Sequence, residues 1–291
     1  MTEKTYRKSY CFALLAISII FVFVCAAYLN RSAVVDKVFA YEKIDRPEMP
    51  NDNAVLKRET KADGSEILSR ATGKVTENGI SEVLVVGDRI KGGEFIENIR
   101  IIVRDLRGKN KSAGIKIVPK INYGYSPVVT LADFTGNGVK EIFYQSNSGG
   151  NGAFSYSYVY SVASGEAVTL FDFDKVPDDF TAEYADYYKV VVKNTATGAV
   201  YYIDISGRGE EYLGGLYNPD GTLKTPVAAD ISVVNTVLPF FRAEENKFGL
   251  LILRRITGLY SADSFGYTQE FFSYGENGFS TYFEGVLINR N

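Results

Sequence analysis

The chain has 291 residues, with 32 basic and 35 acidic side chains and a formal net charge of −3. It contains no histidine, and its two cysteines, Cys11 and Cys25, both lie near the N-terminus. The rest of the chain therefore cannot form a zinc site with histidine or cysteine ligands, a Ser-His-Asp triad, a cysteine nucleophile or an internal disulfide. Oxygen-ligand metal binding, carboxylate chemistry, Ser-Lys chemistry and non-catalytic recognition remain.

The first predicted element is an apolar helix over residues 11–28, a segment without any charged side chain. At 1.5 Å per residue, a helix of this length just spans a hydrocarbon core. Three basic residues among residues 1–10 predict that this tail is cytoplasmic and that the rest of the chain is extracytoplasmic. A cleaved signal peptide is the alternative, because small residues at 25–27 suit a cleavage point. We therefore expect a single-pass protein of the cell membrane, secreted if the segment is cleaved.

Residues 29–66 are polar, interrupted by proline and without sustained periodicity, which is typical of a stalk or linker. Residues 67–291 then have the length of a single all-β domain. Residues 1–30 carry a net charge of +2, so the remainder carries −5. A mildly acidic body without a basic patch argues against nucleic acid as a partner.

Short apolar runs typical of β-strands recur along the body. They cover residues 82–87, 99–103, 114–118, 126–131, 142–145, 188–193, 200–205, 271–274 and 279–283. Residues 153–161 alternate strictly, with Phe154, Tyr156, Tyr158 and Tyr160 on one face, which predicts a half-buried strand. Hairpin turns are expected at residues 194–198 and 275–278, and a short helix fits residues 178–188. The pattern as a whole predicts an all-β fold.

The loop between the runs 126–131 and 142–145 offers the most chemistry. Oxygen-bearing side chains stand at its positions 1, 3, 5 and 9, namely Asp133, Thr135, Asn137 and Glu141, and Val139 would add its backbone carbonyl. Ca²⁺ prefers six to eight such oxygens, and two formal negative charges predict a dissociation constant on the order of 10⁻⁴–10⁻³ M. The alternative is a polar turn in which Asp and Asn side chains bond nearby backbone N–H groups.

The segment LADFTGNGVKEIF resembles the calcium loop of FG-GAP/VCBS repeats, which occur in integrin-α-type propeller blades and in bacterial surface proteins. A degraded copy covers residues 73–83, where Lys74 replaces the first Asp, and a fainter copy begins at Phe241. The first two copies are 59 residues apart and the next interval, 108 residues, is about twice 54, which suits about four propeller-like antiparallel units. In the degraded copy, Lys74 is either an internal salt link to Glu82 or simply solvated.

The whole body is also similar to uncharacterised VCBS-repeat proteins of Gram-positive spore-forming bacteria. This resemblance, together with the missing catalytic residues, implies a membrane-anchored, calcium-binding module for binding or scaffolding at the cell envelope, without enzymatic activity. Its partner would be an envelope protein or a glycan. A purely structural envelope or spore-associated protein is one alternative. The other is a carboxylate-dependent enzyme acting on cell-wall polysaccharide, for which acidic side chains at 172, 174, 178, 179 and 183 are the candidates.

Overall fold

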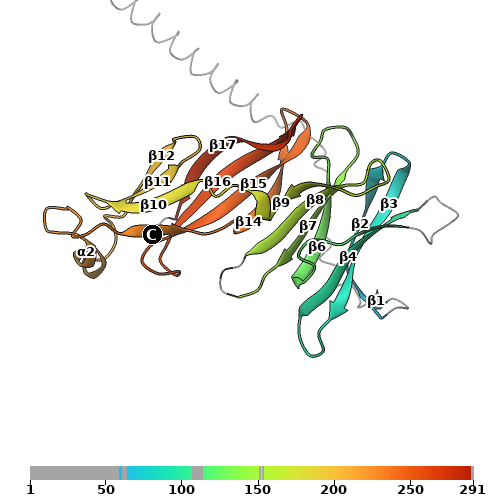
Figure 1. Cartoon of the computed structure of the whole chain (residues 1–291), viewed down its shortest axis with the longest axis horizontal. Coiled ribbons are helices and arrows are strands. Elements are labelled where there is room, and N and C mark those ends of the chain that lie inside the picture. The colour runs from blue at the N-terminus through green and yellow to red at the C-terminus, as the bar shows by residue number, and fades with distance from the viewer. Residues whose placement is uncertain (1–58, 61–63, 107–113, 151, 153, 290–291) are drawn as a thin grey trace, which may run out of the picture. The chain divides into compact units, whose positions relative to one another are not determined.

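The computed structural model describes residues 59–60, 64–106, 114–150, 152 and 154–289, drawn in colour in Figure 1. They belong to one compact unit, Leu56–Asn291. Within the described residues the chain forms seventeen strands, one short 3₁₀ helix and one α-helix, so the expected all-β class is confirmed. All the strand pairs are antiparallel, and they form two sheets (Figure 1).

The first sheet has the strand order β1-β2-β3-β4-β6-β7-β8-β9, and β5 pairs with β4. The sheet curls, so that β2 lies against β6: the Val129 N–H donates to Ser69 Oγ at 3.2 Å, and the Lys140 N–H donates to the Lys74 carbonyl at 2.8 Å. Its strands are β1 (Glu59–Thr60), β2 (Glu66–Thr76), β3 (Gly79–Arg89), β4 (Phe95–Asp105), β5 (Ile115–Ile117), β6 (Gly124–Ala132), β7 (Glu141–Asn147), β8 (Ser155–Ser161) and β9 (Val168–Asp172).

The second sheet follows after the 3₁₀ helix η1 (Phe173–Lys175) and has the order β12-β11-β10-β13-β15-β16-β17, with β14 paired to β15. Helix α2 (Glu210–Leu216) lies in the connection between β12 and β13. This sheet also curls, so that β17 lies near β11 and β12. Glu284 of β17 accepts hydrogen bonds from Asn194 Nδ2 at 2.6 Å and from the Tyr201 hydroxyl at 3.3 Å. Its strands are β10 (Phe180–Ala185), β11 (Lys189–Asn194), β12 (Val200–Asp204), β13 (Ala228–Ile231), β14 (Thr236–Arg242), β15 (Lys247–Thr257), β16 (Ser264–Gly275) and β17 (Gly278–Ile288).

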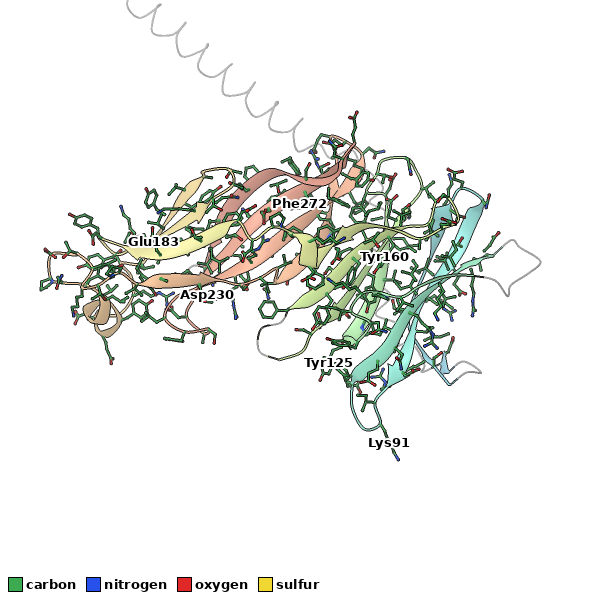
Figure 2. All side chains as sticks on the ribbon, viewed as in Figure 1. Lys91, Tyr125, Tyr160, Glu183, Asp230 and Phe272 are labelled. Atoms are coloured by element: carbon green, nitrogen blue, oxygen red, sulfur yellow. The ribbon has the colours of Figure 1, made fainter. Side chains whose placement is uncertain are left out.

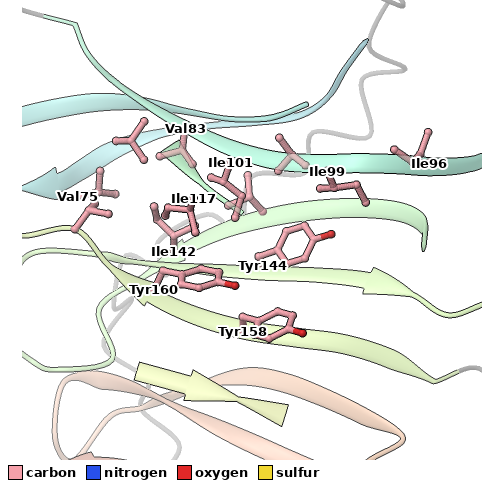
Figure 3. Packing of buried hydrophobic residues seen from close by; sticks show 14 residues of the cluster. Val75, Val83, Ile96, Ile99, Ile101, Ile117, Ile142, Tyr144, Tyr158 and Tyr160 are labelled. Atoms are coloured by element: carbon pink, nitrogen blue, oxygen red, sulfur yellow. The ribbon is translucent and has the colours of Figure 1, made fainter. Parts of the chain in front are cut away.

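Three clusters of buried side chains hold these sheets together. The first fills the inside of the first sheet, where β3, β4, β7 and β8 face one another (Figure 3). The second joins the sheets, since Phe134, Phe143 and Val159 pack with Leu250 and Ile252. The third lies inside the second sheet and includes residues of β10, β11, β15 and α2's C-terminus. Figure 2 shows the side chains on both sheets, with Tyr160 and Phe272 labelled.

Two local predictions are wrong, and tertiary packing is the reason in both cases. Strand β8 is buried on both faces instead of one: Tyr158 and Tyr160 enter the first cluster, while Val159 on the opposite face enters the cluster between the sheets. Residues 178–188 do not form a helix, because 180–185 make strand β10. Phe180 and Tyr184, four positions apart on one face of this strand, are buried. Helix α2 is not predicted, since its sequence EEYLGGL contains two poorly helix-forming glycines.

The described residues form two sheets and do not show the four propeller-like units that the repeat spacing predicts. Among them, no helix is both long enough and apolar enough to cross a membrane. The expected cytoplasmic tail (1–10) and anchor (11–28) lie outside the described residues. Strand β1 lies inside the range 29–66 that the composition assigns to a stalk, and it pairs with the start of β2 at Glu66 and Ile67.

A candidate calcium loop where the two sheets meet

The loop between β6 and β7 is organised by side chains that accept hydrogen bonds from its own backbone. Asp133 Oδ1 accepts from the Gly136 N–H at 2.6 Å, and Oδ2 accepts from the Gly138 N–H at 2.8 Å. Both glycines have φ of 77°, a left-handed conformation that side chains disfavour. Asn137 Oδ1 accepts from the Val139 N–H at 2.7 Å. The spacing of Asp, Asn and Gly therefore produces the tight loop that the sequence predicts.

Glu141, the first residue of β7, is hydrogen-bonded through its carboxylate to the start of this loop. It is fully buried, and its Oε2 accepts from the Phe134 N–H at 2.8 Å and the Thr135 N–H at 3.3 Å. Its Oε1 accepts from Thr135 Oγ1 at 3.0 Å. Burial raises the pKa of the Glu141 carboxyl because it removes water from the charged form, and the charge of Asp133 raises it further. The three hydrogen bonds oppose that rise without cancelling it.

The expected ligands Asp133, Thr135, Asn137 and Glu141 are thus gathered in one loop, and the Val139 side chain is buried beside them. A carboxylate oxygen has two lone-pair positions, so Asp133 Oδ1 and Oδ2 and Glu141 Oε1, which each accept one hydrogen bond, keep one position for a cation, whereas Glu141 Oε2 accepts two and keeps none. The described residues contain no group of three or more Asp, Glu, His or Cys side chains suited to a metal. An ion here would need neutral oxygens in addition to the two carboxylates.

The same loop connects the two sheets. Phe134 is fully buried, and its ring centroid lies 6.2 Å from that of Phe248 and 5.8 Å from that of Phe279, both in the second sheet. The Asp133 carbonyl accepts a hydrogen bond of 2.7 Å from the Phe248 N–H. Backbone and core contacts therefore connect the loop to β15 and β17. A ligand bound in the loop would lie at the junction of the two sheets.

Comparison with known proteins identifies the family. The model of the YybI C-terminal domain matches residues 178–287, which include all of β10 to β16 and most of β17. The chain is 30% identical to "Uncharacterized protein YybI" of Bacillus subtilis (strain 168) over 206 residues, which are 70% of this chain and 78% of that protein. The chain belongs to the YybI family. No solved structure matches it. These comparisons give no sign of FG-GAP/VCBS repeats.

The two degraded copies of the loop are also hairpin turns, and both contact the central one. Residues 73–83 span the β2–β3 turn, where the Lys74 carbonyl accepts the Lys140 N–H. Glu82 lies 3.5 Å from Arg70 Nε, which favours the solvated alternative for Lys74 over a salt link to Glu82. The copy that begins at Phe241 forms the β14–β15 turn at the start of the strand containing Phe248. The three segments that resemble the calcium loop are therefore three turns, of which the central one contacts the other two where the two sheets meet.

Three of the five acidic residues that the sequence offers as catalytic candidates form local structural contacts. Asp172 Oδ1 accepts from the Asp174 N–H at 3.1 Å and caps η1, and Asp174 forms an ion pair with Lys120. Glu183 of β10 pairs with Lys193 of β11 at 2.6 Å. These are a helix cap and exposed ion pairs on separate elements, which is the usual structural use of such residues.

Sequence reasoning does not find two buried polar networks in the YybI domain. Asp263, whose side chain is fully buried, accepts from the Tyr212 hydroxyl at 2.6 Å and the Leu259 N–H at 3.1 Å, and it lies 3.1 Å from Arg208 Nη1. The Tyr212 hydroxyl also lies 2.5 Å from that of Tyr184, which fixes α2 to the sheet. In the sequence, Asp263 stands in a polar turn and gives no sign of burial.

The second network is the ion pair between Arg254 of β15 and Glu270 of β16, both buried. Arg254 also donates to the Pro177 carbonyl at 2.5 Å. Burial raises the pKa of Glu270, the neighbouring Glu284 and Asp179 add to the rise, and Arg254 opposes it. Only the strand register brings these charges together, since Arg254 and Glu270 lie in apolar alternating runs of different strands.

Proposed function

We propose that this chain is a non-enzymatic module for binding or scaffolding on the outer side of the cell membrane, held there by residues 11–28. In this proposal the Asp133–Glu141 loop takes up Ca²⁺, and its partner is an envelope protein or a glycan. The observation that supports it best is the position of the loop, because Glu141 accepts a hydrogen bond from the backbone of Phe134, whose ring contacts join the sheets.

Electrostatics support the choice of a cation for the loop. The charge of Asp133 raises the pKa of the buried Glu141 carboxyl, so the two carboxylates repel each other. A divalent cation between them would remove this repulsion and use lone pairs that the backbone N–H groups leave free. A dissociation constant on the order of 10⁻⁴–10⁻³ M is typical of extracellular modules and would still allow occupancy at millimolar calcium.

The absence of a catalytic role rests on chemistry of the sequence and on the engaged acidic residues. The chain has no histidine, and its cysteines lie only at positions 11 and 25. Asp172, Asp174 and Glu183, three of the five carboxylates considered for a glycan-cleaving enzyme, cap a helix or form ion pairs. Within this proposal, the repeat resemblance describes three related hairpin turns at one junction, around a single calcium loop.

The location can be tested in protoplasts that produce the full chain with an epitope tag at each end. Protease added outside should remove the C-terminal tag and spare the N-terminal one, since the basic residues within 1–10 hold the tail in the cytoplasm. A cytoplasmic marker protein that stays intact until lysis is the control. If the C-terminal tag also survives until lysis, the envelope location is wrong.

A further inference from the structure

The second sheet has an outward face on which apolar side chains form a row across four strands. Leu238 of β14 is the register partner of Leu251 on β15, which is opposite Phe271 on β16, and Phe271 is opposite Phe283 on β17. Side chains alternate along a strand, and the neighbours of Leu251 on both sides are fully buried in the inter-sheet core. The row therefore lies on the opposite, outer face.

Further apolar side chains extend this row. Leu287 lies on the same face of β17, and the ring of Phe240 lies 5.3 Å from that of Phe271. None of these residues belongs to the three core clusters, and Leu238, Phe283 and Leu287 are 43%, 54% and 50% exposed. We name this surface the outer face; it comprises Leu238, Phe240, Leu251, Leu253, Tyr267, Phe271, Tyr282, Phe283 and Leu287.

The size of the outer face reaches the upper end of what an isolated monomer normally exposes. A large side chain covers roughly 200 Å² when fully accessible, so these half- and partly exposed residues together present on the order of 600 Å². The largest apolar patch on a typical monomer is about 300–600 Å². A stable interface of standard size buries about 800 Å² on each partner, which the outer face and its polar rim would supply.

We propose that the outer face is the surface on which a second copy of this chain docks. An isologous pair packs the same patch against itself, so an apolar row crossing four strands meets an identical row, as in sheet-on-sheet packing. This inference concerns only the second sheet, and it does not depend on calcium in the Asp133 loop.

The charges at the rim favour a second copy over a lipid surface. Arg242 lies 3.9 Å from the ring centroid of Tyr282, but it is neutralised by Glu244 at 3.1 Å and Glu245 at 2.6 Å. A patch that binds anionic lipid needs an excess of basic side chains, whereas at this corner of the rim one arginine is paired with two glutamates. Paired charges also allow two identical rims to meet without net repulsion.

Photo-crosslinking of the purified full chain tests the proposal. Phe283 is replaced by p-benzoyl-phenylalanine, and the protein, reconstituted in lipid vesicles, is irradiated. A band at twice the chain mass of 32.2 kDa is expected. The same photoreactive residue at Tyr260, an exposed aromatic in the β15–β16 loop of the same domain, should give no such band.

A second measurement uses charge to break the pair. Phe283→Glu places a charge within the proposed apolar interface of each copy and should weaken self-association in sedimentation experiments at least ~100-fold. Tyr260→Glu should leave it unchanged. Crosslinks to lipid only, crosslinks within one copy only, or a monomer at all concentrations would overturn the proposal. Loss of association in both Glu variants would overturn it as well.

Discussion

Replacing Asp133 by Asn tests whether the loop binds calcium or is only a polar turn. The Asp133 carboxylate is a metal ligand in the first case and only a hydrogen-bond acceptor in the second. Asn keeps the size of the side chain and one carbonyl oxygen, but its amide nitrogen cannot accept a hydrogen bond. One of the two bonds from Gly136 and Gly138 is therefore lost. Asp133 is partly exposed, so water replaces that partner, and the cost without calcium should be about 1 kcal/mol.

Calcium should then distinguish the variant from the wild-type protein. With a dissociation constant near 10⁻⁴ M, about 10 mM Ca²⁺ stabilises the folded state by ~2.7 kcal/mol. For a body of this size, that is roughly 5–10 °C in melting temperature. The Asn variant should lose most of this increment, since an amide oxygen replaces the first carboxylate ligand.

The assay is the thermal melting of the full chain in EDTA and in about 10 mM Ca²⁺, with Mg²⁺ at equal concentration as the control for ionic strength. Lys74→Ala, in the neighbouring β2–β3 turn, is the matched control and should keep the full calcium response. Identical wild-type curves in EDTA and calcium would refute the calcium reading and leave a polar turn.

Two further predictions concern buried charges. Calcium affinity, measured by calorimetry at stepped pH, should begin to fall at a higher pH than an ordinary carboxyl would give, because the raised pKa of Glu141 lets protons compete earlier. An affinity that is flat until the ordinary glutamate range contradicts this. Arg254→Leu should cost about 3–5 kcal/mol in urea unfolding, since it leaves Glu270 buried without its partner. The double variant Arg254→Leu/Glu270→Leu should recover much of that loss; a double variant as unstable as the single one would contradict the explanation.

In EDTA, the same raised pKa fixes the sign of the acid dependence of stability. A carboxyl whose pKa is higher in the folded state binds protons more readily there, so its protonated form favours folding. This contribution is complete below the unfolded pKa of about 4.3 and is lost as pH rises through the folded value. Glu141 therefore acts against the usual loss of stability in acid.

Local patterns in the sequence predict most strands because alternation and turn residues act over a few positions. The hairpin between β11 and β12 forms with Gly198 at φ 77°, as its sequence predicts. The loop at Asp133 is equally local, since all its side-chain bonds join residues at most seven positions apart. Its candidate ligands are therefore found by inspection of one short segment.

The features that the sequence does not predict depend on which strands become neighbours. The second face of β8 is buried only because Val159 meets the second sheet, and alternation cannot show what covers a face. The sequence does not predict the outer face either, because its residues come from four strands. Leu238 and Phe283 are 45 positions apart and share a face only through the register of β14 to β17. Asp263 and Arg254 likewise acquire their buried partners through pairing at long range.

The position of Phe134 explains why the stability of a loop variant cannot by itself decide whether the loop binds calcium. The Asp133 carboxylate accepts hydrogen bonds from N–H groups of the loop, and the Asp133 carbonyl accepts one from the Phe248 N–H. The next residue, Phe134, is buried in the core between the sheets. Any change that distorts this loop also disturbs inter-sheet packing, with or without an ion. Only the difference between calcium and EDTA within one variant cancels that packing cost. Asp133→Asn suits this comparison better than a change at the buried Glu141, because its own cost is small and its effect on ligand charge is large.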